Sequence, residues 1–282
     1  MATEFDMDIK KLYGLYKYPE KYRVLPFRIF GNLYYVGNAD VGAHLIDSGD
    51  GLILIDTTYP STAALLIQSI WELGFRPEDI RIILHTHGHF DHFGGTALIK
   101  ALSGARTFLG EADARMFCEQ PQLALCADCR GYAYTEPFVP DVEIRDGDII
   151  SLGNTEIKAV ATPGHTDGVM SFFFDVTDGT NVLRAGLFGG AGVNTMTSDF
   201  IARYHNSQCR RQFPESLEKI RNEKVDITLG NHAAQNHTLE KYEKKKSQKD
   251  GDNPFIDSGE WQEFIRSAGA NFQRMLLAEQ RK

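Results

Sequence analysis

A dense group of metal-ligand side chains between residues 85 and 92 constrains what this chain can fold into more than any other segment. The segment reads His-Thr-His-Gly-His-Phe-Asp-His, so His87, His89, Asp91 and His92 fall within six residues. Imidazole and carboxylate are the usual nitrogen and oxygen ligands of zinc and related metals. In a protein core each of these groups would need a polar partner. One metal ion, or two, is the partner that satisfies all of them.

The residues around this group predict its place in the fold. Residues 80–84, Ile-Arg-Ile-Ile-Leu, are typical of a short buried strand, and the Gly94-Gly95 pair followed by an apolar-periodic run over 96–102 indicates a helix. Open α/β sheets bind ligands in loops at the carboxyl ends of their strands. In an extended loop, residues two apart point the same way, so His87 and His89 would reach one metal. The neighbouring Asp91 and His92 would point apart.

Two further strand ends offer one histidine each. Residues 155–161 predict a strand that runs into a Pro-Gly turn, and this turn presents His165. Residues 225–229 predict another short strand, which is followed by Gly-Asn and His232. Five histidines and one aspartate in three loops of this kind indicate a shared metal site rather than separate structural histidines.

These motifs resemble those of the metallo-β-lactamase superfamily. The matching pieces are the His-x-His-x-Asp-His group over 87–92, the Thr-Pro-Gly-His-Thr turn over 162–166, the Asn-His pair at 231–232, and the strand over 52–55 that ends at Asp56. The resemblance covers residues 27–240. It implies an α+β fold, the four-layer αβ/βα sandwich, in which two mixed β-sheets are flanked by helices.

The resemblance also implies a site for two zinc ions per chain. Position by position, three histidines would hold the first metal, and one aspartate with two histidines would hold the second: His87, His89 and His165, then Asp91, His92 and His232. In that family a hydroxide bridges the two metals and attacks the substrate. Asp91 is the expected catalytic residue because it would orient this hydroxide.

One departure from the family narrows the expected function. Glyoxalase II and the homoserine-lactone lactonases of this superfamily carry an Asp that bridges both metals, after the strand that follows the Pro-Gly-His turn. The corresponding residues 182–194 contain no carboxylate. A second site of Asp, His and His, without a bridging Asp or a Cys ligand, is similar to the third subclass of class B β-lactamases. We therefore expect a zinc hydrolase that cleaves an amide or ester bond, most like a β-lactamase.

Other functions of the same ligand set remain open. One is a lactonase, or another metabolic ester or thioester hydrolase of the same fold. Another is an iron-dependent oxidative enzyme of the superfamily, because these ligands also hold iron. The third is a metal-binding module without activity.

Two residues outside the ligand set are expected to support the site. Asp56 is expected to hydrogen-bond to the metal-loop backbone or to a ligand histidine, as carboxylates around metal sites do, or else to cap a loop. Asn194 lies in the segment 189–198, which is rich in Gly, Asn, Thr and Ser. It is expected to bind a substrate carboxylate, although this segment also fits a glycine turn needed for sheet closure. His85 is expected to pack or to support the ligands from behind.

Composition and charge limit the partners. The 282 residues, 42% of them hydrophobic, suffice for one domain over 1–282, with a leader over 1–26 and a C-terminal loop and helix over 243–282. A net charge of −8 disfavours binding to a phosphate backbone, so we expect a small-molecule substrate and no nucleic acid. No apolar stretch reaches transmembrane length, so no membrane is expected. Because the amino terminus lacks signal-peptide features, we expect a cytoplasmic protein, or a periplasmic or secreted one if the chain starts at a mature end.

The remaining patterns concern the outer elements and the cysteines. Helices are predicted over 61–73, with Ser61 as the N-cap, over 214–223 and over 260–277, and a loop is predicted over 243–259. The Cys126-x-x-Cys129 pair is interpreted as ordinary thiols, as a local disulfide in an exported protein, or as a redox or zinc motif. No second such pair completes a structural zinc site. The sequence does not set the oligomeric state.

Overall fold

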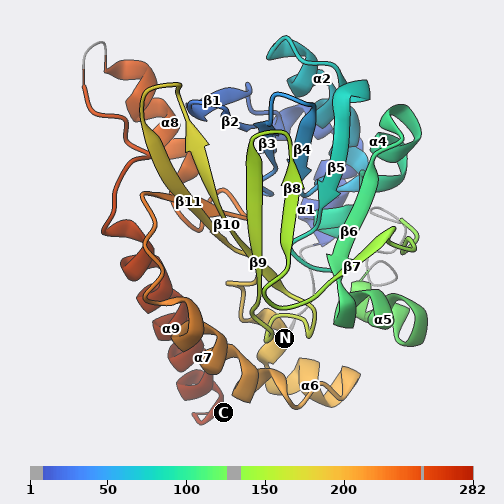
Figure 1. The fold of residues 1–282 in the computed structure, drawn as a ribbon. Helices are drawn as coiled ribbons and strands as arrows, with labels where there is room; N and C mark the ends of the chain where they lie inside the picture. The colour runs from blue at the N-terminus through green and yellow to red at the C-terminus, as the bar shows by residue number, and fades with distance from the viewer. Residues whose placement is uncertain (1–8, 126–134, 249–250, 282) are drawn as a thin grey trace.

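Two β-sheets packed face to face form the centre of the fold, with helices on both outer surfaces (Figure 1). The structure, a computed structural model, describes residues 9–125, 135–248 and 251–281. The cysteine pair at 126 and 129 lies outside the described residues. The α+β sandwich expected from the sequence is confirmed.

The seven-stranded sheet follows chain order. Its first four strands are antiparallel neighbours, and the last three are added in parallel: β1 (Phe27–Phe30), β2 (Leu33–Tyr35), β3 (His44–Asp47), β4 (Leu52–Ile55), β5 (Ile80–Leu84), β6 (Arg106–Gly110) and β7 (Val142–Ile144). Helices α2 (Ala63–Glu72) and α4 (Thr96–Ser103) cover its outer face. Strand β4 is buried on both faces because it lies between these helices and the second sheet.

The five-stranded sheet has the order β12-β11-β10-β9-β8. All its neighbours are antiparallel except β11 and β12, which are parallel: β8 (Ile149–Leu152), β9 (Thr155–Ala161), β10 (Met170–Thr177), β11 (Val182–Phe188) and β12 (Ile227–Gly230). Helices α7 (Cys209–Ile220) and α9 (Glu260–Glu279) pack on its outer face. Helix α8 (Thr238–Ser247) lies beside β1, where Tyr242 stacks on Phe27 with ring centroids 4.0 Å apart.

The main core lies between the two sheets. It is built from the inward-facing aliphatic and aromatic side chains of nearly every strand, among them the fully buried Ile53, Leu84, Phe172 and Leu187. Alternate residues of the strands face this layer because side chains alternate along a strand. This core fixes the ends of the strands, and with them the loops that carry the expected ligands.

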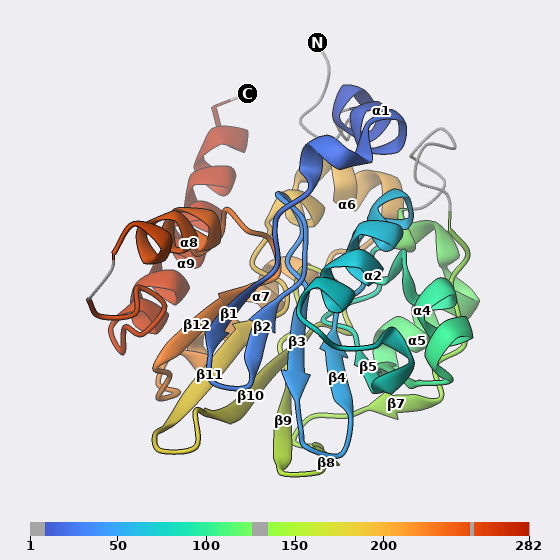
Figure 2. The same cartoon turned by 90° about the horizontal axis from the view of Figure 1, so that it is seen from above.

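Four helices gather at the end of the sandwich where those loops lie: α1 (Ile9–Lys17), α3 (Phe90–Phe93), α5 (Glu111–Glu119) and α6 (Ser198–Tyr204). Figure 2 shows α1 beside α6 on this side of the molecule. Leu12 and Leu15 of α1 are buried in one apolar cluster with Phe90, Phe117 and Phe200. The amino-terminal helix therefore packs over the loop end of the sheets.

Several element boundaries differ from the sequence predictions. Ser61 is not an N-cap, because it lies in a 3-10 turn (Pro60–Thr62) and α2 begins at Ala63 without a side-chain cap. The predicted loop over 243–259 is wrong at its start, since α8 continues to Ser247. Helix α7 begins at Cys209 and includes Pro214, which was expected to start it.

Other 3-10 turns cover Pro19–Tyr22, Pro77–Asp79, Pro121–Ala124 and Asn194–Met196. No helix within the described residues is both long enough and apolar enough to cross a membrane.

Candidate metal centre

The three histidine-bearing loops meet at one end of the sandwich. The first follows β5, the second joins β9 to β10, and the third follows β12. Backbone and side-chain bonds tie them together: the Met170 amide donates to the Thr86 carbonyl (2.8 Å), and the Asn231 side-chain amide donates to the Gly189 carbonyl (2.7 Å). Both sheets therefore contribute to a single site.

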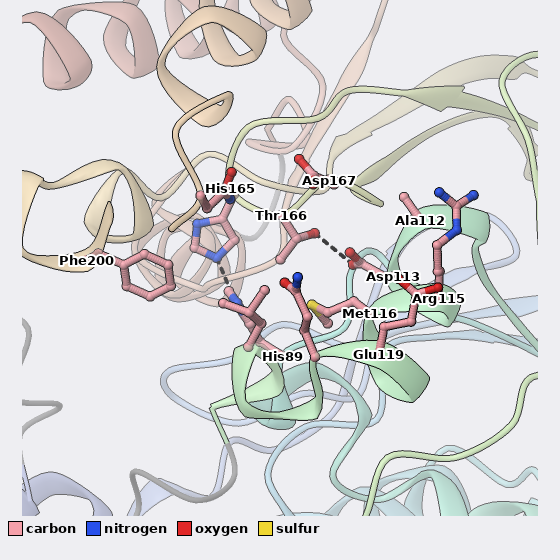
Figure 3. A pocket seen from close by; sticks show the side chains of 13 residues that line it. His89, Ala112, Asp113, Arg115, Met116, Glu119, His165, Thr166, Asp167 and Phe200 are labelled. Atoms are coloured by element: carbon pink, nitrogen blue, oxygen red, sulfur yellow. Dashed lines mark hydrogen bonds between the residues drawn. The ribbon is translucent and has the colours of Figure 1, made fainter. Parts of the chain in front are cut away.

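His87, His89 and His165 form the first cluster, with one ligand atom from each within 4.8 Å of the others. His89 Nδ1 and His165 Nε2 are 3.0 Å apart, and Figure 3 shows a dashed line that joins these two side chains. Two nitrogens at ordinary zinc distances in a tetrahedral site are about 3.3 Å apart. The first cluster therefore has the spacing of a ligand set, and the expectation that His87 and His89 reach one point agrees with the geometry.

Asp91, His92 and His232 form the second cluster. Asp91 Oδ2 lies 3.5 Å from Nε2 of His92 and 3.5 Å from Nε2 of His232. His87 also comes within 4.8 Å of Asp91 and His92, so the two clusters adjoin. The His232 side chain is 31% exposed and that of Asp91 16%, whereas His92 is fully buried. The second cluster is thus the side of the site that solvent reaches.

The expected orientation of Asp91 and His92 was wrong. They were expected to point apart from an extended loop, but both lie on α3, a single helical turn that starts directly after His89. Adjacent residues of a helix are about 100° apart, yet the ends of these two side chains meet, with Asp91 Oδ2 3.5 Å from His92 Nε2. The Gly94-Gly95 pair separates α3 from α4, and α4 begins at Thr96 as the sequence predicted.

Asp56 determines which ring nitrogen carries the proton in two histidines. Its Oδ2 accepts hydrogen bonds from His92 Nδ1 and from the Thr86 hydroxyl, each 2.8 Å long, and Oδ1 accepts from the Thr86 amide (2.8 Å). Because the Thr86 hydroxyl donates to Asp56, it accepts from His87 Nδ1 (3.1 Å). Both imidazoles are therefore protonated on Nδ1, which leaves the Nε2 lone pair of each free to bind a metal.

Those two free atoms test whether the site fits a metal. Nε2 of His87 and Nε2 of His92 are buried and have no hydrogen-bond partner within the part of the chain that the structure describes. A buried polar atom without a partner costs about 1–3 kcal/mol. A cation between the clusters would satisfy both atoms, so the residues present fit a metal.

The electrostatics keep the first cluster neutral. Burial lowers the pKa of His165 to about 4, and it lowers the pKa values of His87 and His89 well below the usual range, with neighbouring histidines adding to the effect. Burial also opposes the charged form of His92, but the nearby Asp91 and Asp56 outweigh it and raise the pKa. Neutral imidazoles are the form that binds metals.

Asp113, which the sequence reasoning missed, connects two of the loops. Its carboxylate accepts from the Gly88 amide (2.7 Å), the Thr166 hydroxyl (2.7 Å) and the Gly168 amide (2.9 Å). Burial raises the pKa of Asp113 to about 6, against the effect of these hydrogen bonds. In the sequence it stands in the first turn of a helix, where an aspartate is common, so no local signal marked it.

Asp40 is a second residue that the sequence did not indicate. Its carboxylate accepts from the Tyr59 hydroxyl (2.6 Å), pairs with Lys11 of α1 (2.6 Å) and lies 3.8 Å from His232 Nδ1. Burial opposes its charge, but His232 and Lys11 hold the pKa of this carboxyl well below its usual range. Asp40 therefore joins the amino-terminal helix to the exposed histidine of the second cluster.

His85, in contrast, takes no part in the clusters. It is buried, its Nδ1 donates to the Phe108 carbonyl (2.8 Å), and its Nε2 accepts from the Thr96 hydroxyl (2.7 Å). Both ring nitrogens are thus used in packing β5 against β6 and α4.

The segment that lacks a bridging carboxylate has tightly packed glycines at and just after the end of β11. A Cβ at Gly189 would lie 2.1 Å from the Met170 carbonyl oxygen, and one at Gly190 would lie 2.8 Å from Val169. At Gly186 a Cβ would meet Val225 at 2.7 Å. No side chain fits these positions without a shift of the neighbouring strand or loop.

Asn194 lies beside a different cavity from the one that reaches the histidines. A cavity of about 200 Å³ is lined by His89, Asp113, His165 and Phe200 among others (Figure 3). A larger one, of about 670 Å³, lies between the loop over 191–199 and α9, and Asn194 is exposed on its wall. Gly192 lines the larger cavity, and its carbonyl accepts a hydrogen bond from Nδ1 of His165 (2.9 Å), which lines the smaller one.

Comparison with known proteins gives one family. The sequence model described as "Metallo-beta-lactamase superfamily" matches residues 39–228. Among curated proteins, the hydroxyacylglutathione hydrolase of Francisella tularensis subsp. novicida is 34% identical over 98 residues, which are 34% of this chain and 30% of that protein. That of Acidiphilium cryptum is 30% identical over 136 residues, 48% of this chain and 45% of that protein. The chain thus spans less than half the length of either relative.

Solved structures match over nearly the whole chain. BJP-1, a subclass B3 metallo-β-lactamase of Bradyrhizobium japonicum, is 29% identical with a TM-score of 0.79, over 92% of this chain and 96% of that one. The metallo-β-lactamase FEZ-1 from Legionella gormanii is also 29% identical, with a TM-score of 0.81, over 92% of this chain and 98% of that one.

Proposed function

The chain belongs to the metallo-β-lactamase superfamily, and on that premise we propose that it is a dinuclear zinc hydrolase that cleaves an amide or ester bond, most like a β-lactamase. The observation that supports this proposal best is the pair of adjoining clusters, with the unpartnered Nε2 atoms of His87 and His92 between them. The similarity to subclass B3 enzymes, at 29% identity over most of the chain, supports the choice of branch.

We assign each cluster one metal. The first takes three histidines and the second takes an aspartate and two histidines: His87, His89 and His165, then Asp91, His92 and His232. Zinc at such a site supplies a nucleophile from water at neutral pH and polarises the scissile carbonyl. The second cluster is partly exposed, so we expect water to reach it, and we expect the substrate to enter the cavity that is lined by His89 and His165.

Asp91 is the proposed catalytic residue. Its Oδ2 stands 3.5 Å from Nε2 of both His92 and His232, on the side that solvent reaches. From there the carboxylate can accept a hydrogen bond from the attacking water and orient it towards the substrate carbonyl.

The Asp91→Ala variant tests this role. We expect turnover to be abolished with the fold retained, because Asp91 is partly exposed and its removal leaves no large cavity. Circular dichroism and metal content should be measured alongside hydrolysis. Near-normal hydrolysis with two metals bound would show that Asp91 is not the catalytic residue.

Asn194 is the proposed contact for a substrate carboxylate. It lies on the exposed wall of the larger cavity, two residues after the Gly192 carbonyl that holds His165. We expect Asn194→Ala to raise KM about tenfold with little change in kcat, because the interaction binds substrate and transition state alike. Asp199→Asn, in the same wall, is the matched control. An unchanged KM would leave the segment 189–198 with the role of closing the sheet.

A thioester or lactone substrate is the second candidate. The curated relatives named hydroxyacylglutathione hydrolase, 30–34% identical over parts of the chain, favour it. The absence of a carboxylate from residues 182–194, and the closed backbone at Gly189 and Gly190, favour the β-lactamase-like branch instead.

One screen separates these functions. The zinc-loaded and iron-loaded proteins should be assayed against a chromogenic cephalosporin, an acyl-homoserine lactone and a glutathione thioester, with bound metal measured in each sample. We expect zinc-dependent hydrolysis, fastest with the cephalosporin. Turnover of the thioester or lactone alone would select the second candidate, and a protein that binds no metal would contradict both.

A further inference from the structure

Asp113 occupies a position that no ligand role explains. It lies in the first turn of α5, and its carboxylate is completely buried. Its three hydrogen-bond donors come from two loops that belong to different sheets. Gly88 stands between His87 and His89, after a strand of the seven-stranded sheet. Thr166 and Gly168 follow His165, in the loop that enters β10 of the other sheet.

The chemistry of the three donors requires a carboxylate. Two backbone N–H groups and one hydroxyl converge on two oxygens at 2.7–2.9 Å. Only an ionised carboxylate accepts all three without presenting a hydrogen of its own. Burial alone would favour a neutral side chain, since it raises the pKa of Asp113. The hydrogen-bond donors of the two loops therefore stabilise the ionised form of this buried carboxylate.

Steric contacts show that both loops rest directly on α5. A Cβ at Gly168 would lie 2.3 Å from the Asp113 backbone nitrogen, and a Cβ at Gly88 would lie 2.7 Å from the Met116 methyl group. A Cβ at Gly110, just before α5, would lie 2.1 Å from the Gly168 carbonyl oxygen. Glycine at these positions lets the two loops approach one side of the same helix.

Asp56 and Asp113 contact different parts of the two clusters. Asp56 contacts Thr86 and His92, so it orients the second cluster and the His87 ring. Asp113 contacts the residues beside His89 and His165, and the distance between these two histidines, 3.0 Å, depends on how the two loops sit relative to each other (Figure 3). The first cluster is thus assembled from two sheets across a single side chain.

We propose that Asp113 is a positioning residue that holds His89 and His165 at ligand distance, and that it sets the metal affinity of the first cluster without affecting the second. The inference rests on the proposed metal binding. It assigns the first site a determinant of its own, in addition to Asp56, which reaches one ligand of each cluster.

The Asp113→Asn variant tests the proposal because the amide keeps the size of the side chain and loses an acceptor. Zinc affinity should be measured by competition with a chromophoric chelator on the full-length protein. We expect one of two zinc equivalents to bind about 10- to 100-fold more weakly, as is usual when a group that orients a ligand is removed. The other equivalent should change by less than about threefold. Glu111→Gln, in the same turn of α5, removes the charge that pairs with the exposed Arg145 and should leave both unchanged.

A double variant identifies the affected cluster. His165→Ala removes one ligand of the first cluster, so the zinc that remains reports on the second. Adding Asp113→Asn to His165→Ala should change that remaining affinity by less than about threefold. A further tenfold loss would overturn the proposal, as would an equal loss at both sites, or no loss, in Asp113→Asn alone.

Thr166→Val keeps the inference testable if Asp113→Asn does not fold. This change removes one donor to the carboxylate and leaves the two backbone bonds in place. We expect a smaller loss at the same zinc equivalent, and an unchanged affinity would contradict the proposal. A wild-type protein without two bound metals would refute the proposed function instead, so the two failures are distinguishable.

Discussion

Asp56 controls the protonation of two metal-site histidines from one buried position. It accepts directly from His92, and it reaches His87 through the Thr86 hydroxyl. The chain of donors leaves both Nε2 atoms as acceptors in the metal-free protein. One carboxylate therefore prepares ligands in both clusters before any metal binds.

Replacing Asp56 should weaken metal binding and leave the ligands themselves in place. In Asp56→Asn, the amide nitrogen would oppose either His92 Nδ1–H or the Thr86 donors, so the ring loses its fixed tautomer. We expect zinc affinity to fall about 10- to 100-fold, measured by chelator competition. Asp175→Asn, which removes an exposed carboxylate on β10, is the control. Equal affinities in the two variants would contradict this role of Asp56.

The sequence indicated the proposed ligands and missed the groups that position them. The six proposed ligand residues stand out because three loops carry them in short, recognisable spacings. Asp113 and Asp40 act on residues far along the chain: Gly168 is 55 residues from Asp113, and His232 is still further from Asp40. Such contacts depend on how the sheets pack, which spacing does not reveal.

Helix α1 is the element whose position the sequence could not give. The sequence predicted only a leader over 1–26, and the structure places α1 over the ligand loops. Leu12 and Leu15, at helical spacing, enter the cluster that contains Phe90 and Phe200, while Lys11 pairs with Asp40. The helix thereby connects the amino terminus to the second cluster.

Truncating a buried side chain of α1 should lower the stability of the protein. Leu15 is 1% exposed, so Leu15→Ala should lower the free energy of unfolding by about 2–5 kcal/mol. Denaturant unfolding of the metal-free protein measures the change. Lys17→Ala, on the exposed side of the same helix, should stay within about 0.5 kcal/mol of wild type. A similar small effect from Leu15→Ala would mean that α1 does not pack as described.

Helix α3 shows why very short helices cannot be predicted from the periodicity of the sequence. It has four residues, Phe90–Phe93, too few to display a helical period. Strands β5 and β9, of five and seven residues, were predicted with the bounds that the structure has, because apolar residues fill them and turn residues follow them. Tertiary packing decides the conformation where the pattern is shorter than one period.

Across the whole molecule, several histidines are buried in the neutral form. Burial lowers the pKa values of His44, His85 and His165 to about 4, and those of His87 and His89 are lowered too. Unfolding returns each of them to its ordinary pKa of about 6.5. Two groups act in the opposite sense, since the pKa values of Asp113 and His92 are raised in the folded state.

The metal-free protein should therefore lose stability between about pH 6.5 and pH 4. In this window the unfolded chain binds more protons than the folded chain does at the five histidines whose pKa is lowered by folding. The free energy of unfolding therefore decreases as the pH is lowered. Asp113 opposes this fall between about pH 6 and pH 4, but one carboxyl does not outweigh five imidazoles. Urea unfolding at several pH values, with chelator present, measures the slope. A stability that is flat or rising as the pH falls through this window would contradict the burial of neutral histidines.

The tightly packed glycines at the end of β11 also limit which substitutions evolution can accept there. A glycine codon is one base from an aspartate codon, so mutation supplies the carboxylate of the lactonase and glyoxalase II branches readily. At Gly189 the new Cβ would meet the Met170 carbonyl oxygen at 2.1 Å, and at Gly190 it would meet Val169. The first step would therefore be selected against for folding before any new activity could be favoured. An aspartate at Gly189 therefore requires the Met170 carbonyl to move first, and one at Gly190 requires the Val169 side chain to move.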